Sequence, residues 1–253
     1  MLQNIRIELL KTRRTHTYLI LLILMVISSA WQLFVANAEL VHPGLKEISV
    51  LYNNQTMDCF LVPVMVSIFS SKIISNEKEG QTFKLQKSNG TGIRKIFLSK
   101  LCLMMSIFMC LFVMEAAIRY VYALVNGLHT SLLLVLFFLL GQMLTALSLS
   151  YIFLGLSFLL DKQGVVLAFG FLFGFLGTVL ASRSQSILSF WLPGTGNAYL
   201  APYKYHLLSN DQLSYTYIQD QTLLIRVLIY IAFCFLLRLI VYRVIQKKGV
   251  SQI

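Results

Sequence analysis

Two side chains of opposite charge lie four positions apart inside a long apolar segment of the sequence. Glu115 and Arg119 both fall in "FVMEAAIRYVYALV", so in a helix they share one face and can form an ion pair. Charged side chains inside membrane-spanning segments are costly, and they mark substrate or ion pathways as well as structural pairs. Two interpretations follow: a stabilising pair near the end of the segment, or a contact with a substrate.

The other residue types that support catalysis or metal binding are scattered. No two cysteines have Cys-x-x-Cys spacing, the histidines lack metal-ligand spacing, and "GTGIRK" at 90–95 lacks the phosphate-loop pattern. We therefore predict no catalytic residue, no cofactor site and no metal site in this chain. The cysteines are Cys59, Cys102, Cys110 and Cys234, and the histidines are His16, His42, His129 and His206.

The segments that carry these residues are too apolar for a soluble domain. Of 253 residues, 57% are hydrophobic and 12% are charged, whereas soluble domains carry about a quarter charged residues. A membrane span needs about 20 apolar residues, and spans in lipid must be helical. The sequence predicts an all-α polytopic membrane protein with one membrane domain and six spans. The spans are expected at about 17–36, 59–74, 96–120, 132–160, 164–181 and 223–245.

The basic residues predict the orientation of these spans. With the N-terminus inside, 16 of the 21 Lys and Arg residues fall on the cytoplasmic side and 5 on the outer side, as the positive-inside rule requires. Both termini are therefore expected in the cytoplasm, as in a multi-pass protein of a bacterial cytoplasmic membrane. The net charge of +11 is explained by this bias and by attraction to anionic lipid, so nucleic acid is not an expected partner.

The first 16 residues are amphipathic. Leu2, Ile5, Leu9 and Leu10 alternate with basic residues, a pattern typical of a helix that lies in the membrane interface. We predict such an interfacial helix over 1–16, directly before the first span.

A charged stretch at 72–101 separates the second and third spans. Asn76 can cap a short helix, and Gly80 can break or bend it. Phe83 and Leu85 would give this helix an apolar side. Two interpretations stay open here: a solvated loop whose lysines enforce the topology, or a short amphipathic helix across the cytoplasmic interface.

The connection at 182–222 contains an aromatic and apolar stretch, but this stretch is not long enough to span the membrane. Trp191 and several tyrosines are residue types that settle at the membrane–water boundary, and Pro193 is one of two prolines that break the helix into pieces. In the fifth span, Gly170 and Gly174 form a Gly-x-x-x-Gly pattern with Gly177 one turn further on. Such patterns allow helices to approach closely, and we expect this one to pack within the bundle.

The sequence resembles the permease subunits of ABC type-2 exporters, in particular the small six-helix permeases of the lantibiotic immunity group. The N-terminal "IRIELLKTRRTHTYLILLIL" is similar to the family's Glu-Leu-Leu-Lys stretch, basic cluster and first span. The stretch "SKIISNEKEGQTFKLQKSNGTGIRKIFLSKL" is similar to the acidic loop after the second span, with the family's Glu and Gly positions at Glu77, Glu79 and Gly80. Where many members have Gly-Thr, this chain has Gly80-Gln81-Thr82.

The resemblance implies that 75–95 forms a cytoplasmic coupling loop whose short helix docks in a separate ABC ATPase subunit. Polar contacts with a few apolar anchors suit such docking. The implied coupling residues are Glu77, Glu79, Gly80, Phe83 and Leu85.

The same resemblance implies the partners and the cargo. ATP and magnesium would bind in an ATPase dimer, and a second permease, identical or homologous, would complete the transporter in the lipid membrane. The cargo would be a cationic antimicrobial peptide. Short re-entrant helices are expected within 182–222, and possible substrate or gate residues are Glu115, Arg119, Trp191 and Pro193.

Two alternatives remain open. One is a type-2 exporter for another substrate, such as a drug, a lipid-linked sugar or an ion. The other is a membrane interaction or sensor subunit without transport of its own.

Overall fold

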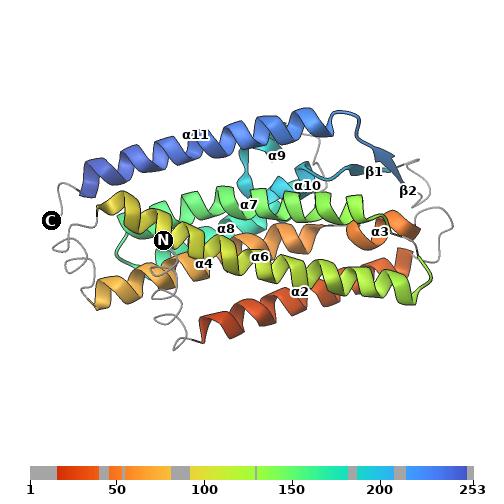
Figure 1. Cartoon of the computed structure of the whole chain (residues 1–253), viewed down its shortest axis with the longest axis horizontal. Coiled ribbons are helices and arrows are strands. Elements are labelled where there is room, and N and C mark those ends of the chain that lie inside the picture. Colours follow the sequence, from red (N-terminus) through yellow and green to blue (C-terminus); the bar gives the residue numbers. More distant parts are fainter. Residues whose placement is uncertain are drawn as a thin grey trace.

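The computed structural model of the chain is a bundle of long helices that run side by side along one axis (Figure 1). Within the described residues, six helices are long and apolar enough to cross a membrane, which confirms the predicted all-α fold with six candidate spans. They are α2 (Thr17–Glu39), α4 (Thr56–Glu79), α6 (Ile93–Val125), α7 (Leu132–Leu159), α8 (Gln163–Ala181) and α11 (Leu223–Gly249). The structure describes residues 16–39, 46–52, 55–80, 92–128, 130–181, 187–207 and 215–249.

Several helices continue beyond the spans predicted from hydropathy. α4 begins three residues before the predicted 59–74 and ends five residues after it, and α6 exceeds the predicted 96–120 at both ends. The starts of α7, α8 and α11 agree with the prediction within one residue. Hydropathy marks the part of a helix that lies in hydrocarbon, whereas backbone hydrogen bonds carry the helix on through polar residues.

The end of α4 corrects the prediction of a separate short helix that begins at Asn76. α4 runs through Asn76 without interruption, and Gly80 follows its last residue, with the Gly80 N–H donating to the Asn76 carbonyl oxygen at 3.1 Å. Glu and Lys favour helix, so the helix outlasts the apolar run. Phe83 and Leu85 lie outside the described residues, as do 1–15 of the predicted interfacial helix.

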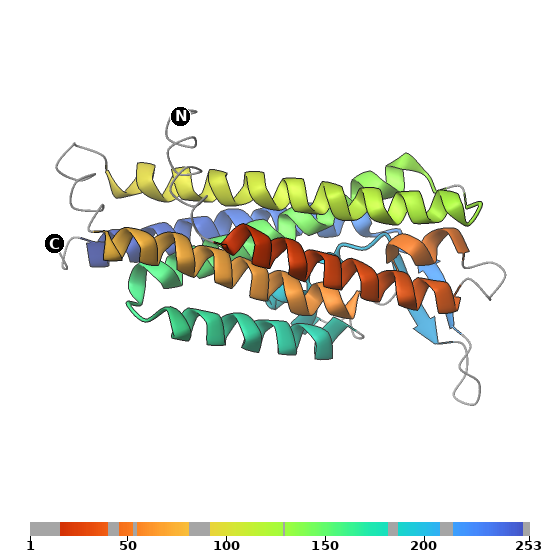
Figure 2. The ribbon, with the colours of Figure 1, turned by 90° about the horizontal axis from the view of Figure 1, so that it is seen from below.

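α4 is the central helix of the bundle. Buried residues make up 78% of its most apolar stretch, against 17% for α11. It packs against α2, α7 and α8, and Figure 2 shows it running beside α2 and α8. Pro63 lies inside α4 and not in its first turn. The core around it is aromatic, with the rings of Phe69 and Phe108 packed edge to face at 6.2 Å.

The connection between α8 and α11 folds into short elements at one end of the bundle. These are α9 (Ile187–Trp191), the 3-10 helix η1 (Pro193–Thr195), α10 (Gly196–Tyr199) and strands β1 (Tyr203–Leu207) and β2 (Tyr215–Gln219). The strands form an antiparallel hairpin in which Tyr203 pairs with Gln219, an element that the sequence analysis does not predict. η1 and α10 pack against α4 and α7. Whether this segment re-enters the bilayer stays a prediction.

The two ends of the bundle differ, and we name them by their elements. The hairpin end holds the β-hairpin and α3 (Lys46–Tyr52), and the loop end is where α4 ends and α6 begins (Figure 1). Between the ends, large apolar side chains such as Phe175 on α8 and Leu228 on α11 are exposed. Helix surfaces covered by such exposed apolar side chains are suited to contact with the hydrocarbon chains of lipids. The assignment of the loop end to the cytoplasm stays a prediction.

Candidate functional site

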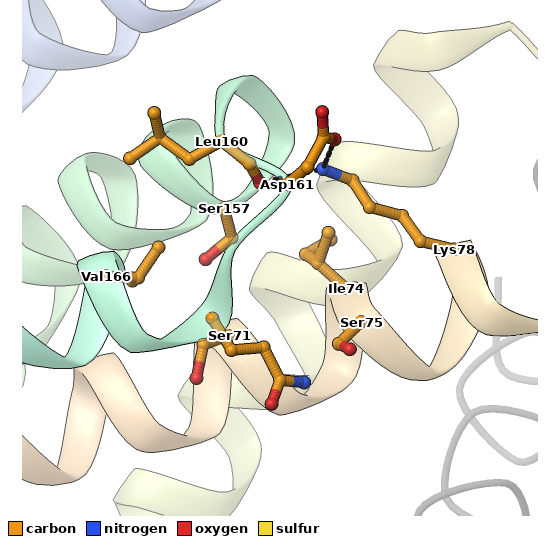
Figure 3. Close-up of a pocket in the computed structure, with 9 residues that line it drawn as sticks. Ser71, Ile74, Ser75, Lys78, Ser157, Leu160, Asp161 and Val166 are labelled. Atoms are coloured by element: carbon orange, nitrogen blue, oxygen red, sulfur yellow. Dashed lines mark hydrogen bonds and ion pairs between the residues drawn. The ribbon is translucent and has the colours of Figure 1, made fainter.

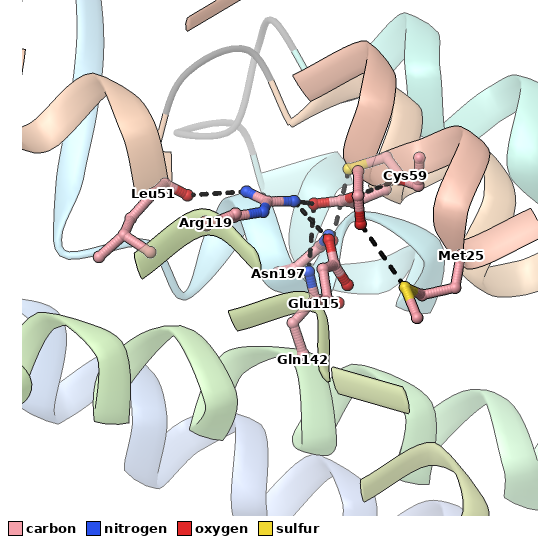
Figure 4. Close-up of polar contacts among 10 residues, drawn as sticks. Met25, Leu51, Cys59, Glu115, Arg119, Gln142 and Asn197 are labelled. Carbon is pink, nitrogen blue, oxygen red and sulfur yellow. Dashed lines mark hydrogen bonds and ion pairs between the residues drawn. The ribbon is translucent and has the colours of Figure 1, made fainter. Parts of the chain in front are cut away.

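A buried guanidinium group joins three helices at the hairpin end. Arg119 of α6 is fully buried, and its Nη2 donates to Glu115 Oε1 at 2.5 Å and to Asp58 Oδ2 of α4 at 2.9 Å. Its Nη1 donates to the carbonyl oxygen of Leu51 in α3 at 3.2 Å. Figure 4 shows these contacts converging on the guanidinium group. The ring of Phe138 on α7 lies 4.6 Å from the guanidinium carbon, a cation–π contact.

Asp58 receives further hydrogen bonds from two other helices. The hydroxyl of Ser28 on α2 donates to its Oδ1 at 2.5 Å, and the amide of Gln142 on α7 donates to its Oδ2 at 3.2 Å. We call Asp58, Glu115, Arg119 and Gln142 the Arg119 cluster. Each of the four side chains is at most 3% exposed, so this cluster ties α2, α4, α6 and α7 together inside the bundle.

The predicted Glu115–Arg119 pair is therefore present, but it belongs to a larger network than the sequence indicated. Asp58 and Gln142 were missed. Asp58 stands directly before the apolar run of the second span, in "TMDCF", where an acid resembles an ordinary loop residue. The side chain of Asp58 is only 1% exposed. The one hint of this in the sequence is its position at the start of an apolar span, where no charge is needed.

The other two predicted gate residues lie apart from the cluster. Trp191 ends α9 and is 66% exposed, with its ring against Phe233 of α11. Pro193 is buried in η1, and its carbonyl oxygen accepts a hydrogen bond from the hydroxyl of Tyr230 at 3.5 Å. A link to the cluster runs through α10, where Asn197 accepts a hydrogen bond from the thiol of Cys59, the neighbour of Asp58 (Figure 4).

A second buried ion pair lies at the loop end. The Nζ of Lys100 on α6 is 2.9 Å from Glu77 Oε2 on α4, and both side chains are at most 3% exposed. Lys100 is therefore not solvated, and the carboxylate of Glu77 faces the inside of the bundle. The role of Glu77 in coupling to the ATPase stays a prediction.

Lys78, next along α4, connects to the turn between α7 and α8. Its Nζ donates to the carbonyl oxygen of Leu160 at 2.8 Å and pairs with Asp161 at 2.9 Å. A small pocket lies beside this contact (Figure 3). Its lining includes the hydroxyl residues Ser71 of α4 and Ser157 of α7. The exposed pair contributes little to stability, but it places the α7–α8 turn against the last turn of α4.

The remaining coupling candidates at the end of α4 are exposed. The carboxylate of Glu79 accepts a hydrogen bond from the Ser75 hydroxyl at 2.7 Å. Gly80 follows it as the residue that ends the helix. Glu79 and Gly80 therefore lie at the exposed end of α4, where a partner protein outside the bundle could contact them.

The two buried ion pairs match each other in spacing. Asp58 and Glu77 are 19 residues apart on α4, and Lys100 and Arg119 are 19 residues apart on the antiparallel α6. At 1.5 Å per residue this is about 28 Å along each helix, close to the ~30 Å of a hydrocarbon core. α4 and α6 are thus joined at two places that lie about one hydrocarbon thickness apart along the helices.

The glycines of α8 explain how closely it lies on α4. A Cβ atom at Gly174 would stand 2.6 Å from the Phe60 carbonyl oxygen, and one at Gly177 would stand 2.6 Å from that of Cys59. Gly170 is buried on the same side. The expectation that this Gly-x-x-x-Gly stripe packs within the bundle is confirmed.

No metal site accompanies these clusters in the part of the chain that the structure describes. Within those residues, no three His, Cys, Asp or Glu side chains stand together as ligands.

Comparison with known proteins identifies the family. The family model described as ABC-2 family transporter protein matches residues 4–177, a range that holds the first four predicted spans, both buried ion pairs and most of α8. No curated protein matches the chain.

Proposed function

The chain belongs to the ABC-2 family of transporter proteins and is the membrane permease of an ABC exporter, and we propose from this premise that it expels a cationic antimicrobial peptide of the lantibiotic kind. Six apolar helices and this family place the protein in the cell membrane. The family also implies association with an ABC ATPase subunit.

The observation that carries the proposal is the double connection between α4 and α6. The segment 80–92 joins these helices at the loop end, and the Glu77–Lys100 pair ties them at its base. The Asp58–Arg119 pair ties the same helices at the hairpin end. A force applied to the connecting segment can therefore reach the far end of the bundle through two helices that are joined at both ends.

The driving force is supplied by the partner ATPase in this proposal. A dimer of ATPase subunits binds ATP and magnesium, and its closure pushes on the segment after α4. Glu79 and Gly80 are exposed at the start of that segment, and Phe83 and Leu85 act as its apolar anchors. A polar rim with a few apolar anchors is the usual composition of such contacts. A second permease, identical or homologous, completes the transporter.

The excess of acids over bases in the Arg119 cluster supports a cationic cargo. The cluster places two carboxylates against one guanidinium group at the hairpin end, and Trp191, apart from the cluster, packs against the rings of Phe190 and Phe233. An amphipathic cation can use both features when the hairpin end opens. Trp191 and Pro193 then belong to the path by which the peptide leaves, as a surface contact and as a buried support.

A protection assay tests this function. The chain is expressed in peptide-sensitive bacteria together with a candidate ABC ATPase subunit, and growth is measured against a cationic lantibiotic and against a neutral lipophilic drug. Protection against the lantibiotic alone, abolished when the ATPase nucleotide site is inactivated, is the expected result. Protection against the drug alone would assign another cargo, and protection that survives inactivation of the ATPase would assign a role without transport.

A further inference from the structure

The Arg119 cluster carries one acid more than it carries bases. Asp58, Glu115 and Arg119 are all buried, and the charged groups close enough to act on Glu115 are Asp58 from α4 and Arg119 from its own helix. With both acids ionised, a charge of −1 would remain inside the bundle. Burial of an uncompensated charge is far more costly than its neutralisation.

The two carboxylates are also close neighbours. Glu115 Oε1 and Asp58 Oδ2 both accept from the same nitrogen, at 2.5 Å and 2.9 Å. These two oxygens therefore stand no further apart than the two bonds laid end to end, 2.5 Å plus 2.9 Å. Like charges at this separation in a buried site disfavour double ionisation, and one carboxylate of such a pair takes up a proton.

Among the described residues, the other elements around the cluster contribute no balancing charge. α2 contributes the Ser28 hydroxyl, α3 contributes the carbonyl oxygen of Leu51, and α7 contributes Gln142. Two further titratable groups of the described chain interact with the cluster. They are the Tyr52 hydroxyl, which donates to the carbonyl oxygen of Leu134 at 2.7 Å, and the Cys59 thiol, which donates to Asn197. Both are neutral hydrogen-bond donors in these contacts.

An independent sign of an additional hydrogen atom is an unpaired acceptor in the same place. Gln142 is fully buried and uses its amide nitrogen on Asp58, while its Oε1 has no partner within the described residues. An acceptor left without a donor in a buried site costs about 1–3 kcal/mol. A protonated carboxyl beside it would be a donor of the kind that this oxygen lacks.

A metal ion does not fit the same place. The described residues offer no group of three or more His, Cys, Asp or Glu side chains as ligands, and both carboxylates are already engaged with Arg119.

The hydrogen bonds distinguish the two acids. Asp58 accepts from three donors, on Ser28, Arg119 and Gln142, and hydrogen bonds to the charged form of a carboxyl group favour that form. Within the described residues, Glu115 accepts a hydrogen bond from Arg119 alone. We propose that the Arg119 cluster is a proton-binding site, in which Glu115 holds one proton while Asp58 and Arg119 form the charged pair.

The proton is bound only while Asp58 remains at Arg119. If α4 moves away from α6 at the hairpin end, Arg119 loses its first counter-ion, the O–H bond of Glu115 breaks, and the proton passes to water. Glu115 then becomes the carboxylate that neutralises Arg119. This site does not depend on which cargo the permease carries.

Infrared difference spectroscopy on the purified full-length chain tests the proposal. At about pH 7 ordinary carboxyl groups are ionised, so a protonated one gives a separate carbonyl band that shifts in heavy water. We expect this band in the wild type and its loss in Glu115→Gln. We also expect its loss in Asp58→Asn, because Glu115 must then ionise to pair with Arg119.

The control variant is Glu79→Gln, which removes an exposed acid and should keep the band. A band that persists in Glu115→Gln, or its absence from the wild type at neutral pH, would overturn the proposal. The wild-type spectrum decides the matter even if a variant fails to fold. Persistence in Asp58→Asn with loss in Glu115→Gln would overturn the assigned linkage to Arg119.

Discussion

The carboxylate of Glu77 on α4 lies 2.9 Å from the Nζ of Lys100 on α6, and both side chains are buried. This contact holds together the two helices that flank the segment expected to meet the ATPase. Removing one partner of a buried ion pair leaves an uncompensated charge, which typically costs about 3–5 kcal/mol.

Glu77→Gln should therefore lower the free energy of unfolding of the purified protein by about 3–5 kcal/mol, and its melting temperature should fall. The exchanged double variant, Glu77→Lys with Lys100→Glu, should recover part of the loss because it restores a pair of opposite charges. Glu79→Gln on the exposed side of the same turn should change stability by less than about 0.5 kcal/mol. Equal melting temperatures for Glu77→Gln and Glu79→Gln would show that the buried pair does not stabilise the bundle.

Alanine at Gly174 or Gly177 should loosen α8 from α4. The new Cβ would meet a backbone carbonyl oxygen at 2.6 Å in each case, and backbone cannot move aside as a flexible side chain can. Overpacking of this kind costs about 1–3 kcal/mol. Gly164→Ala on the same helix, where nothing lies within 4 Å, is the matched control. Unfolding measured by circular dichroism should separate the two kinds of variant, and a neutral Gly177→Ala would contradict the close packing.

Phe83→Ala should weaken the association with the ATPase while membrane insertion stays normal. Truncating an apolar hot-spot anchor costs more than about 1 kcal/mol, which is several-fold in affinity. Co-purification with the ATPase measures the effect, and Phe175→Ala, an exposed apolar position on α8, serves as the control. If both variants retain the ATPase equally, the segment after α4 serves only to set the topology.

Single cysteines at Lys87 and at Gln219, in a background without the four native cysteines, should react with an impermeant reagent from opposite sides of the membrane. Lys87 belongs to the expected cytoplasmic segment, and Gln219 is exposed on β2 of the hairpin. Labelling of intact cells should modify Gln219→Cys, and labelling of inverted vesicles should modify Lys87→Cys. Equal labelling from one side would refute the orientation.

The purified chain alone should not hydrolyse ATP, and ATPase activity should appear only with a separate subunit. The sequence contains no phosphate-loop pattern, which a nucleotide-hydrolysing domain of this transporter class needs. Steady-state hydrolysis with and without the partner is the measurement, and turnover by the lone chain after removal of contaminants would contradict the assignment.

Local patterns in the sequence were enough for the features that depend on one helix. A run of about 20 apolar residues predicts a span wherever it occurs, and Glu115 and Arg119 are partners because they are four residues apart. The glycine stripe of α8 is likewise visible in a single segment, and its close packing is confirmed against α4.

The parts that were missed depend on contacts between helices. Asp58 and Arg119 are 61 residues apart in sequence, and no periodicity relates them. Lys100 stands in a basic stretch, where the positive-inside rule explains it without a partner. Only the antiparallel packing of α4 on α6 distinguishes a buried counter-ion from a topology signal.

The equal spacing of the two buried pairs also decides which relative motions are cheap. A lengthwise slip of α4 past α6 would pull both pairs out of alignment together, because their partners are matched at both ends. Opening the two helices at the hairpin end breaks the Asp58–Arg119 pair alone and leaves the Glu77–Lys100 pair as the pivot. Shear and hinge motions are distinct ways for helices to move, and this pinning favours a hinge at the loop end over a slip of α4 along α6.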